Sequence, residues 1–183
     1  LAIKKTGAVF VEGQMDVISA YQCGINNVVC ISGTSLTENQ LNILSRYTQD
    51  LTFCFDSDFA GIEASYRAIE MAEKKNFNVR VALIPAPFKD LDELIRSDPV
   101  TARRIIENPV PVYDFFLATT LKKHNKETAI GKKEIMEDLV PLFSKISNKV
   151  LLEHYVKQIS SELNISEDTI YSLFRESLPE REE

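Results

Sequence analysis

The sequence has few of the residues that build disulfide frameworks or soft-metal sites. Among its 183 residues are three cysteines, Cys23, Cys30 and Cys54, and two histidines, His124 and His154. An odd number of cysteines, at spacings unlike those of zinc ligands, argues against a disulfide framework and against a zinc module. We expect the cysteines to be reduced core thiols, as in a cytoplasmic protein, and the histidines to be surface residues with no carboxylate cluster nearby.

Long apolar runs are absent as well. No stretch approaches the roughly 20 apolar residues that cross a bilayer, and no signal peptide is recognisable. The composition, 44% hydrophobic and 26% charged, is typical of a globular domain. We therefore expect a cytoplasmic protein without a membrane partner. Because the sequence opens on Leu1 and enters an apolar strand almost at once, we expect it to be part of a longer protein.

The sequence also lacks the excess of positive charge with which nucleic-acid-binding domains meet phosphates, since its net charge is −6. Residues 1–96 contain 9 lysines and arginines against 12 acids, and six of those acids are the candidate site residues named below. A site that holds divalent cations needs such concentrated negative charge. The acidic balance therefore neither excludes nor supports a DNA or RNA partner.

Short β-branched runs alternate with amphipathic stretches in the first half of the chain. The expected strands are 8–11, 27–31, 51–55 and 79–84, and the expected helices are 14–21, 38–46 and 60–75. This alternation is typical of a parallel sheet with right-handed crossovers and helices on its faces. Thr37 and Gln40 have the spacing of a capping box at one helix start. In such folds the ligand site lies at the carboxyl ends of the strands.

Helical periodicity replaces the strand pattern after the proline-containing stretch 85–111. The expected helices are 112–123, 132–144, 149–163 and 167–176. Ser166 is a suitable N-cap for the last of them. The sequence therefore predicts an α/β domain at 1–108 followed by an all-helical subdomain at 109–183.

Pairs of acids follow three of the expected strands. They are Glu12 with Asp16, Asp56 with Asp58, and Asp90 with Asp92. Residues two apart in an extended segment point to the same side, so Asp56 and Asp58 can face one cation. Carboxylates without histidine or cysteine favour Mg²⁺ or Mn²⁺ over zinc or copper. For any single acid a structural role is the stronger interpretation, with Asp58 as the cap of the helix that starts near residue 60 and Asp90 as a turn residue. Several like charges at one sheet edge, however, repel one another and require a cation.

A short segment rich in Ser, Thr and Gly, SGTSLT, connects the second expected strand to a helix start. Its glycine allows close backbone approach, and its hydroxyls and amides can face a phosphate. The nucleotide- or phosphate-binding candidates in it are Ser32, Gly33, Thr34 and Ser35. The same composition is common in a plain turn with a helix cap, so that alternative stays open.

Taken in order, these motifs resemble the Toprim domain, and more narrowly its version in bacterial DnaG-type DNA primases. The segments that carry the resemblance are EGQMDVI, SGTSLT, CFDSDFAG and KDLDE, within residues 9–95. Two positions depart from the family pattern: Ser57 stands where primases often have glycine, and Leu91 where proline is common. Neither departure removes an acid. The helical remainder resembles the segment that follows Toprim in the primase polymerase core.

The resemblance implies a Toprim-like parallel sheet flanked by helices and part of a DNA-templated RNA polymerase, a nucleotidyltransferase that makes RNA primers for DNA replication. The implied catalytic and metal-binding residues are Glu12, Asp56 and Asp58, and Asp16, Asp90 and Asp92 extend the cluster around Mg²⁺ or Mn²⁺. The implied partners are a single-stranded DNA template, ribonucleoside triphosphates and the RNA primer, with the replicative helicase held by parts outside this chain.

Primases also carry a zinc module and a basic subdomain before Toprim, and this sequence contains neither. We therefore expect no zinc site within the chain, and little or no primer synthesis by the chain alone.

Two other kinds of function stay open from the residues alone. A Toprim-type nuclease would use the same acids, and a related topoisomerase would need a nucleophilic tyrosine, whereas the tyrosines here have helical spacing typical of packing residues. A non-catalytic module could instead recruit a partner through its helices, with charges such as Lys132 and Lys133 on otherwise amphipathic faces. Specific binding of a divalent metal ion would separate the enzyme from the module.

Overall fold

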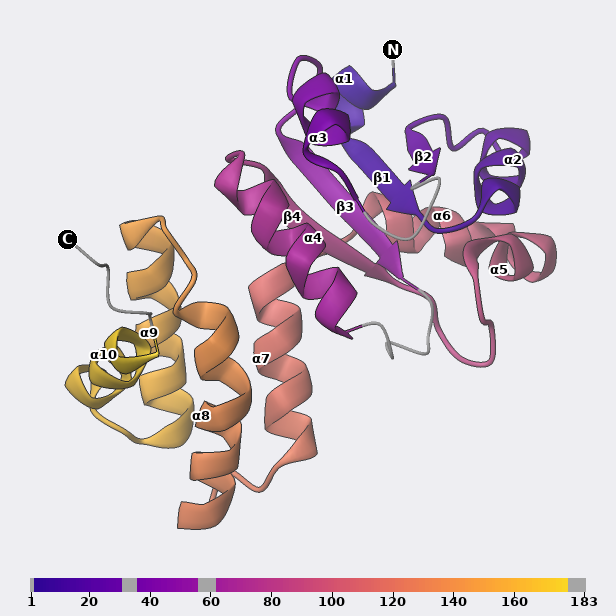
Figure 1. The fold of residues 1–183 in the computed structure, drawn as a ribbon. Helices are drawn as coiled ribbons and strands as arrows, with labels where there is room; N and C mark the ends of the chain where they lie inside the picture. The colour runs from indigo at the N-terminus through magenta and orange to yellow at the C-terminus, as the bar shows by residue number, and fades with distance from the viewer. Residues whose placement is uncertain (1, 31–35, 56–61, 178–183) are drawn as a thin grey trace. The chain divides into compact units, whose positions relative to one another are not determined.

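The computed structural model describes residues 2–30, 36–55 and 62–177, and it divides into two compact units, Leu1–Val112 and Tyr113–Glu183 (Figure 1). The sequence predicts the end of the α/β domain at residue 108. The first unit extends to Val112 because a short strand at Val110–Pro111 pairs with the sheet. Within the described residues, no helix is both long and apolar enough to cross a membrane.

The first unit is built on a five-stranded sheet in the order β2-β1-β3-β4-β5. Its strands are β1 Ala8–Val11, β2 Val28–Cys30, β3 Asp50–Phe55, β4 Asn78–Leu83 and β5 Val110–Pro111. The first four are parallel and agree with the predicted strands to within about one residue. The predicted parallel sheet is confirmed over these four strands, and the sheet has a fifth strand, β5, which the sequence did not predict and which pairs antiparallel with β4. Proline is tolerated there because an edge strand leaves one side without ladder hydrogen bonds.

Helices cover both faces of this sheet (Figure 1). They are α1 Ile3–Thr6, α2 Gln14–Gln22, α3 Glu38–Leu44, α4 Ile62–Lys74, α5 Leu91–Ser97 and α6 Pro99–Glu107. Val9 and Val11 point to the face covered by α2, α5 and α6, where they join a buried apolar cluster. Phe10 and Phe53 point to the opposite face and stack with ring centroids 5.7 Å apart. Burial on both faces accounts for the wholly apolar sequence of β1.

Local capping signals set several helix starts. The capping box of α3 is confirmed. The backbone amide of Gln40 donates to Thr37 Oγ1 at 3.3 Å, and the backbone amide of Thr37 donates to Gln40 Oε1 at 2.8 Å. The sequence did not predict α5 and α6. The carboxylate of Asp98 accepts from the Thr101 amide, and Pro99 occupies the first helical position, where proline suits a helix start. This proline therefore begins a helix instead of merely separating elements.

The second unit is a bundle of α7 Val112–Lys123, α8 Ala129–Phe143, α9 Lys149–Leu163 and α10 Glu167–Glu176. Three of these helices have the predicted bounds. The helix predicted at 132–144 starts earlier, because Thr128 Oγ1 accepts from the Gly131 amide at 3.0 Å and caps it. The predicted N-cap Ser166 is confirmed, since its hydroxyl accepts from the Thr169 amide at 3.2 Å.

His124 does not have the isolated surface environment expected from the sequence. Its side chain is 14% exposed and lies between two carboxylates, with Nδ1 3.1 Å from Glu134 Oε2 and Nε2 2.9 Å from Asp138 Oδ2. The same Asp138 oxygen accepts from Lys123 Nζ at 2.9 Å. Partial burial pushes the pKa of Asp138 upward, but the hydrogen bonds and charges of Lys123 and His124 outweigh burial and leave this pKa below its ordinary value of 3.8.

Replacing Asp138 by Asn should destabilise the second unit at neutral pH but not in acid. A carboxylate whose pKa is lower in the folded state adds stability above its unfolded-state pKa and loses that contribution as the pH falls through the folded-state value. Its side chain is 38% exposed, so solvent screening keeps the contribution below about 1 kcal/mol. Thermal unfolding should therefore show a Tm deficit of a few degrees at pH 7 that shrinks as the pH falls below the ordinary pKa value of 3.8. An equal deficit at neutral and at acidic pH would contradict this role.

Candidate metal site at the carboxyl edge of the sheet

Glu12 is the first residue after β1 and lies at the carboxyl edge of the sheet. Val11 before it is buried in the sheet, whereas Glu12 itself is exposed. Its backbone carbonyl accepts a hydrogen bond from the Cys30 thiol at 3.1 Å, next to the Val11 and Cys30 register pair of β1 and β2. Gly13 follows as the N-cap of α2. The strand thus anchors the backbone of Glu12 and leaves its carboxylate open to solvent, as a metal ligand requires.

Asp16 lies one helical turn after this cap and is buried, with 5% of its surface exposed. Its Oδ2 accepts from the Gly13 amide and its Oδ1 accepts from the Asp92 amide, each at 2.9 Å. Burial raises the pKa of Asp16; the two backbone hydrogen bonds oppose this rise, and the charges of Asp90 and Asp92 add to it. The structure therefore brings together Asp16, Asp90 and Asp92, as the sequence predicts, with both Asp16 oxygens engaged by backbone amides.

Asp90 and Asp92 flank the start of α5. Asp90 is the N-cap, and its Oδ1 accepts from the Glu93 amide at 2.7 Å. Asp92 Oδ1 accepts from the Ser19 hydroxyl and, at 3.0 Å, from Arg96 Nε. Among the described residues, no hydrogen bond to the second oxygen, Oδ2, of either side chain is present. Asp90 thus serves as a helix cap, a role the sequence did not predict for it, and both acids keep one oxygen for a further ligand.

Ser19 and Arg96 are contacts of the site that the sequence did not reveal. Ser19 is buried on α2, three residues after Asp16, and Arg96 follows Asp92 by four residues on α5. The i,i+4 spacing of Asp92 and Arg96 is a usable signal for an ion pair on one helix face. The Ser19 contact joins residues 73 positions apart. It could be found only once α2 and α5 were known to pack together.

Asp56 and Asp58, and the candidates Ser32, Gly33, Thr34 and Ser35, lie outside the described residues. The strands that lead to them are described. Phe55 ends β3, which lies between β1 and β4, and Cys30 ends β2 on the other side of β1. Because these four strands are parallel, the chain leaves all of them at the edge that carries Glu12.

The donor set at this edge suits a hard cation. The acids supply only oxygen ligands, which favour Mg²⁺ or Mn²⁺. Within the described ranges, however, no three His, Cys, Asp or Glu side chains are arranged to hold a metal ion. Glu12 and the Oδ2 atoms of Asp90 and Asp92 are available there, and the other two predicted ligands, Asp56 and Asp58, fall outside those ranges.

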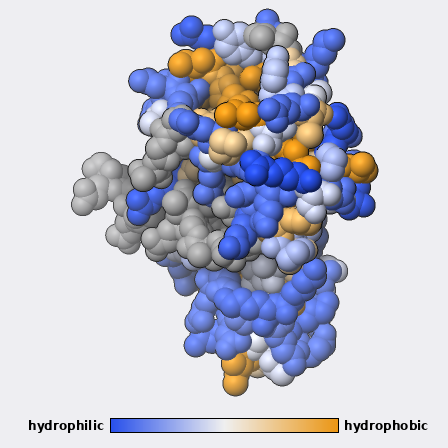
Figure 2. All heavy atoms as spheres, turned by 90° about the vertical axis from the view of Figure 1, so that its right-hand side faces the viewer, coloured by the Kyte–Doolittle hydropathy of each residue, from blue (hydrophilic) through white to orange (hydrophobic). Residues whose placement is uncertain are grey.

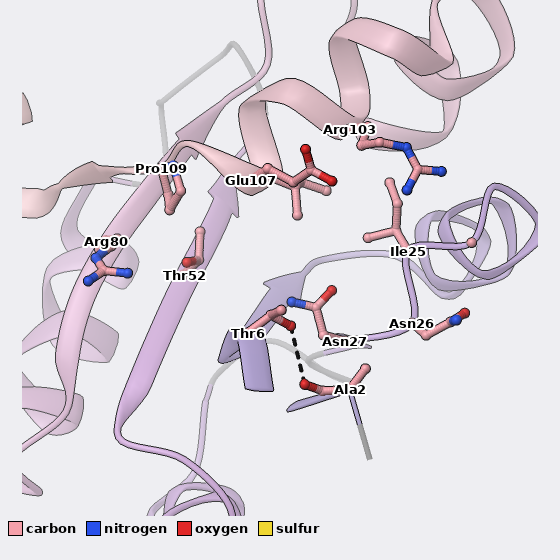
Figure 3. Close-up of a pocket in the computed structure, with 12 residues that line it drawn as sticks. Ala2, Thr6, Ile25, Asn26, Asn27, Thr52, Arg80, Arg103, Glu107 and Pro109 are labelled. Carbon is pink, nitrogen blue, oxygen red and sulfur yellow. Dashed lines mark hydrogen bonds between the residues drawn. The ribbon is translucent and has the colours of Figure 1, made fainter. Parts of the chain in front are cut away.

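A separate cavity of about 380 Å³ lies toward the amino ends of the strands (Figure 3). Its polar lining includes Thr6, Asn27, Thr52, Arg80, Arg103 and Glu107. Asn27 Nδ2 donates to the Gly7 carbonyl at 3.1 Å, and Arg103 donates to the Cys23 carbonyl, so both side chains hold loops of the first unit together. The lining of the cavity includes one carboxylate and two guanidinium groups, and Glu12 is not part of it. The cavity is therefore separate from the carboxyl edge of the sheet that carries Glu12, called the acidic edge below.

The face of the first unit that carries α2 and α5 shows hydrophobic side chains scattered among hydrophilic ones (Figure 2). Met15, Ile18 and Tyr21 on α2 are 50%, 48% and 70% exposed. They follow one another at intervals of three residues, so they form one side of the helix, while Asp16 and Ser19 on its other side are buried. The helix thus presents its polar site residues inward, toward α5, and its apolar residues outward.

Two families match this chain in the order of its two units. Residues 9–95 match the family described as Toprim-like, and residues 113–168 match the DnaB-helicase binding domain of primase. A DNA primase of Clostridium acetobutylicum is 32% identical over 166 residues, which are 90% of this chain and 28% of that protein. A DNA primase of Listeria innocua is 33% identical over 181 residues, 97% of this chain and 29% of that protein.

Solved primase structures have the same fold. A DNA primase domain from Pseudomonas aeruginosa superposes with a TM-score of 0.75 at 29% identity, covering 92% of this chain and 54% of that one. A DnaG primase catalytic domain bound to single-stranded DNA superposes with a TM-score of 0.71 at 27% identity, covering 88% of this chain and 52% of that one. The chain thus spans under a third of the curated relatives and about half of the solved domains.

The parallel strands with acids at their carboxyl ends, and the family match over them, define the first unit as a Toprim-like α/β domain. The helical unit follows it in the order that primases have. The chain belongs to the bacterial DnaG-type DNA primase family, of which it contains the Toprim part and the helical part behind it.

Proposed function

We propose that this chain supplies the metal-binding part of a DNA primase, a DNA-templated RNA polymerase that makes RNA primers from ribonucleoside triphosphates. The observation that carries the proposal is the placement of the three acid pairs after parallel strands of one sheet, in a chain whose relatives are DNA primases. A hydrolytic Toprim enzyme would use the same acids, but the match to a primase-specific helical domain favours primer synthesis.

In this proposal Glu12, Asp56 and Asp58 hold Mg²⁺ or Mn²⁺, and Asp90 and Asp92 add negative charge and ligand oxygens. The bound metal would activate the primer 3′-hydroxyl and neutralise charge on the triphosphate. This assignment is supported by the pairing of β1 with β3, because Glu12 follows β1 in the sequence and Asp56 follows β3. The amides and hydroxyls of residues 32–35, after β2, would contact the triphosphate from the other side of β1.

The decisive experiment measures primer synthesis by the full-length protein that contains this chain, on a single-stranded DNA template. Glu12→Gln and Asp56→Asn should each abolish most of the activity, because each removes a proposed metal ligand. The isolated chain should make little or no primer under the same conditions, since it lacks a zinc module and a basic template-holding subdomain. Robust synthesis by the isolated chain, or wild-type activity in both variants, would overturn the proposal.

We propose that the replicative helicase binds the helical unit of this chain. The sequence led us to expect helicase contacts only in parts outside it, whereas the match to a helicase-binding domain covers residues 113–168. A groove of about 560 Å³ on this unit is lined with apolar side chains of α8, α10 and the turn between α9 and α10, with lysines at its rim. The residues are Ala129, Met136, Val140, Ile165 and Leu173, with Lys132, Lys133 and Glu137. We propose that an amphipathic helix of the replicative helicase, carrying acids beside its apolar face, binds there.

Val140→Glu should weaken the binding of this chain to its replicative helicase by about tenfold or more, because it places a negative charge in an apolar groove. Val140 is partly exposed, so the variant should still fold. Ile130→Glu is the matched control, since Ile130 is 72% exposed on the same helix and does not line the groove. Fluorescence anisotropy with the purified helicase measures both affinities, and equal affinities would show that the helicase does not use this groove.

A further inference from the structure

The contacts of Asp16 are those of a structural carboxylate. It is buried, and each of its two oxygens accepts a backbone amide hydrogen bond of 2.9 Å, one from Gly13 and one from Asp92. A Cβ added at Gly13 would lie 3.0 Å from Asp16 Oδ2, so the glycine leaves room for the close approach of this oxygen. Each oxygen keeps a second lone pair, so the feature that sets Asp16 apart from the exposed Glu12 is burial together with a backbone amide held by each oxygen.

These hydrogen bonds connect two parts of the acidic edge that are far apart in the sequence. Gly13 adjoins Glu12 at the end of β1, and Asp92 lies 76 residues from Asp16, in the first turn of α5 after β4. In the sheet, β3 lies between β1 and β4. Asp16 therefore connects the segments that follow β1 and β4, the two strands on either side of β3. In the sequence, β3 is the strand that leads to Asp56 and Asp58.

Ser19 and Arg96 extend the same connection to the side chain of Asp92. The Ser19 hydroxyl, one turn after Asp16 on α2, donates to Asp92 Oδ1, and Arg96 Nε donates to the same oxygen at 3.0 Å. Asp92 is thus held at its backbone by Asp16 and at Oδ1 by Ser19 and Arg96. Its Oδ2 has no hydrogen bond within the described part of the chain and is left for a ligand at the edge.

We propose that Asp16 is a positioning residue, not a metal ligand: through the Gly13 and Asp92 amides it fixes Glu12 and Asp92 relative to each other around the proposed metal site. This role rests on the proposed function, because it presumes that the edge holds a divalent cation. It replaces the ligand role that the sequence predicts for Asp16, and it accounts for a carboxylate in a buried position beside two other acids. Residues that orient metal ligands commonly change metal affinity by about 10-fold to 100-fold when they are replaced.

The first test compares Asp16→Asn with Asp56→Asn in this chain, by thermal unfolding in chelator and by Mn²⁺ titration followed by the electron paramagnetic resonance of free Mn²⁺. An asparagine has one acceptor oxygen, so Asp16→Asn leaves one of the two amides facing an NH₂ group. We expect a lower Tm in chelator and a Kd for Mn²⁺ raised about tenfold or more. Asp98→Asn is the matched control, because Asp98 caps α6 and asparagine can cap equally well; its Mn²⁺ affinity should equal that of the wild type.

The second test needs no variant and follows the Gly13 and Asp92 amide protons of the wild type by NMR during titration with diamagnetic Mg²⁺. A positioning residue keeps both hydrogen bonds, so both amides should stay protected from solvent exchange at saturating Mg²⁺. Faster exchange of either amide on metal binding would mean that the carboxylate turns to the metal, and it would overturn the positioning role.

The outcomes of the first test separate this inference from the proposed function. If Asp56→Asn loses Mn²⁺ binding while Asp16→Asn binds as tightly as the wild type, only the positioning role fails. The role fails equally if Asp16→Asn loses binding but keeps its full stability in chelator, since that is the behaviour of a ligand. If Asp56→Asn binds Mn²⁺ as well as the wild type, the proposed metal site itself is wrong.

Discussion

Replacing Asp56 by Asn should remove most of the stabilisation that Mn²⁺ gives to this chain. A cation that binds only the folded state stabilises it by about 2.7 kcal/mol when its concentration is 100 times the Kd. For a unit of this size that corresponds to a Tm increase on the order of 10 °C. If Glu12, Asp56 and Asp58 converge as proposed, their like charges repel without metal, so Asp56→Asn should unfold at the same temperature as the wild type or slightly above it.

A structural acid would behave in the opposite way. Loss of a helix cap or of a buried hydrogen bond costs about 0.5 to 2 kcal/mol with or without metal. Asparagine can itself cap a helix, so Asp58→Ala should be measured beside Asp56→Asn. The measurement is thermal unfolding of the wild type and both variants in chelator and in millimolar Mn²⁺. If the wild type and Asp56→Asn gain equally from the metal, Asp56 is not a ligand.

The strands and most helices could be predicted because their signals are local. β1 is a short apolar run that is buried on both faces of the sheet, β4 contains an alternation of exposed and buried residues, and the helices of the second unit follow caps such as Ser166. The fifth strand could not be predicted in this way. Val110 and Pro111 are exposed and carry no strand pattern, and they become a strand only because β4 presents a free edge to them.

The location of the acidic edge could be predicted from the sequence, but the hydrogen bonds among its residues could not. Parallel direction follows from the alternating pattern, and the carboxyl ends of parallel strands, after which the acids come in the sequence, lie at one edge. The strand order was not predicted. Whether an acid is a metal ligand or a structural residue depends on its burial and on hydrogen-bond partners that are distant in the sequence. The spacing of Gly13 and Asp16 does carry one usable signal, since an acid three residues after an N-cap commonly accepts from the cap amide. The second partner of Asp16, the Asp92 amide, is supplied by tertiary packing.

His124 illustrates the same limit in the second unit. Glu134 and Asp138 lie on α8, one helix further along the chain, and they meet His124 only because α7 and α8 pack as neighbours. The sequence shows the right spacing between the two acids, four residues apart on one helix face, but it does not show which side chain lies opposite them. A local count of charges around a histidine is therefore a poor guide to its environment in a helical bundle.

Phe143→Ala should unfold the second unit, or lower its Tm by about 15 °C or more, while the first unit keeps its own transition. Phe143 is fully buried at the end of α8, and its ring meets those of Tyr113 and Tyr155 at centroid distances of 5.1 Å and 5.4 Å. The Tyr155 hydroxyl in turn donates to Asp114 Oδ1 at 2.9 Å, so the cluster joins α7, α8 and α9. Truncating a buried phenylalanine costs about 3 to 5 kcal/mol, most of the stability that so small a unit can have.

Differential scanning calorimetry of the whole chain checks this expectation, because it records the transitions of both units. The first unit can be identified in the same experiment, since Mn²⁺ should raise only its transition. Ile130→Ala is the control within the bundle: Ile130 is 72% exposed, and its removal should change stability by no more than about 0.5 kcal/mol. If Phe143→Ala lowers both transitions together, the two units unfold as one, and the compact division at Val112 does not mark independent folding. If only the metal-insensitive transition moves, the aromatic cluster holds the helical unit together and the acidic edge folds without it.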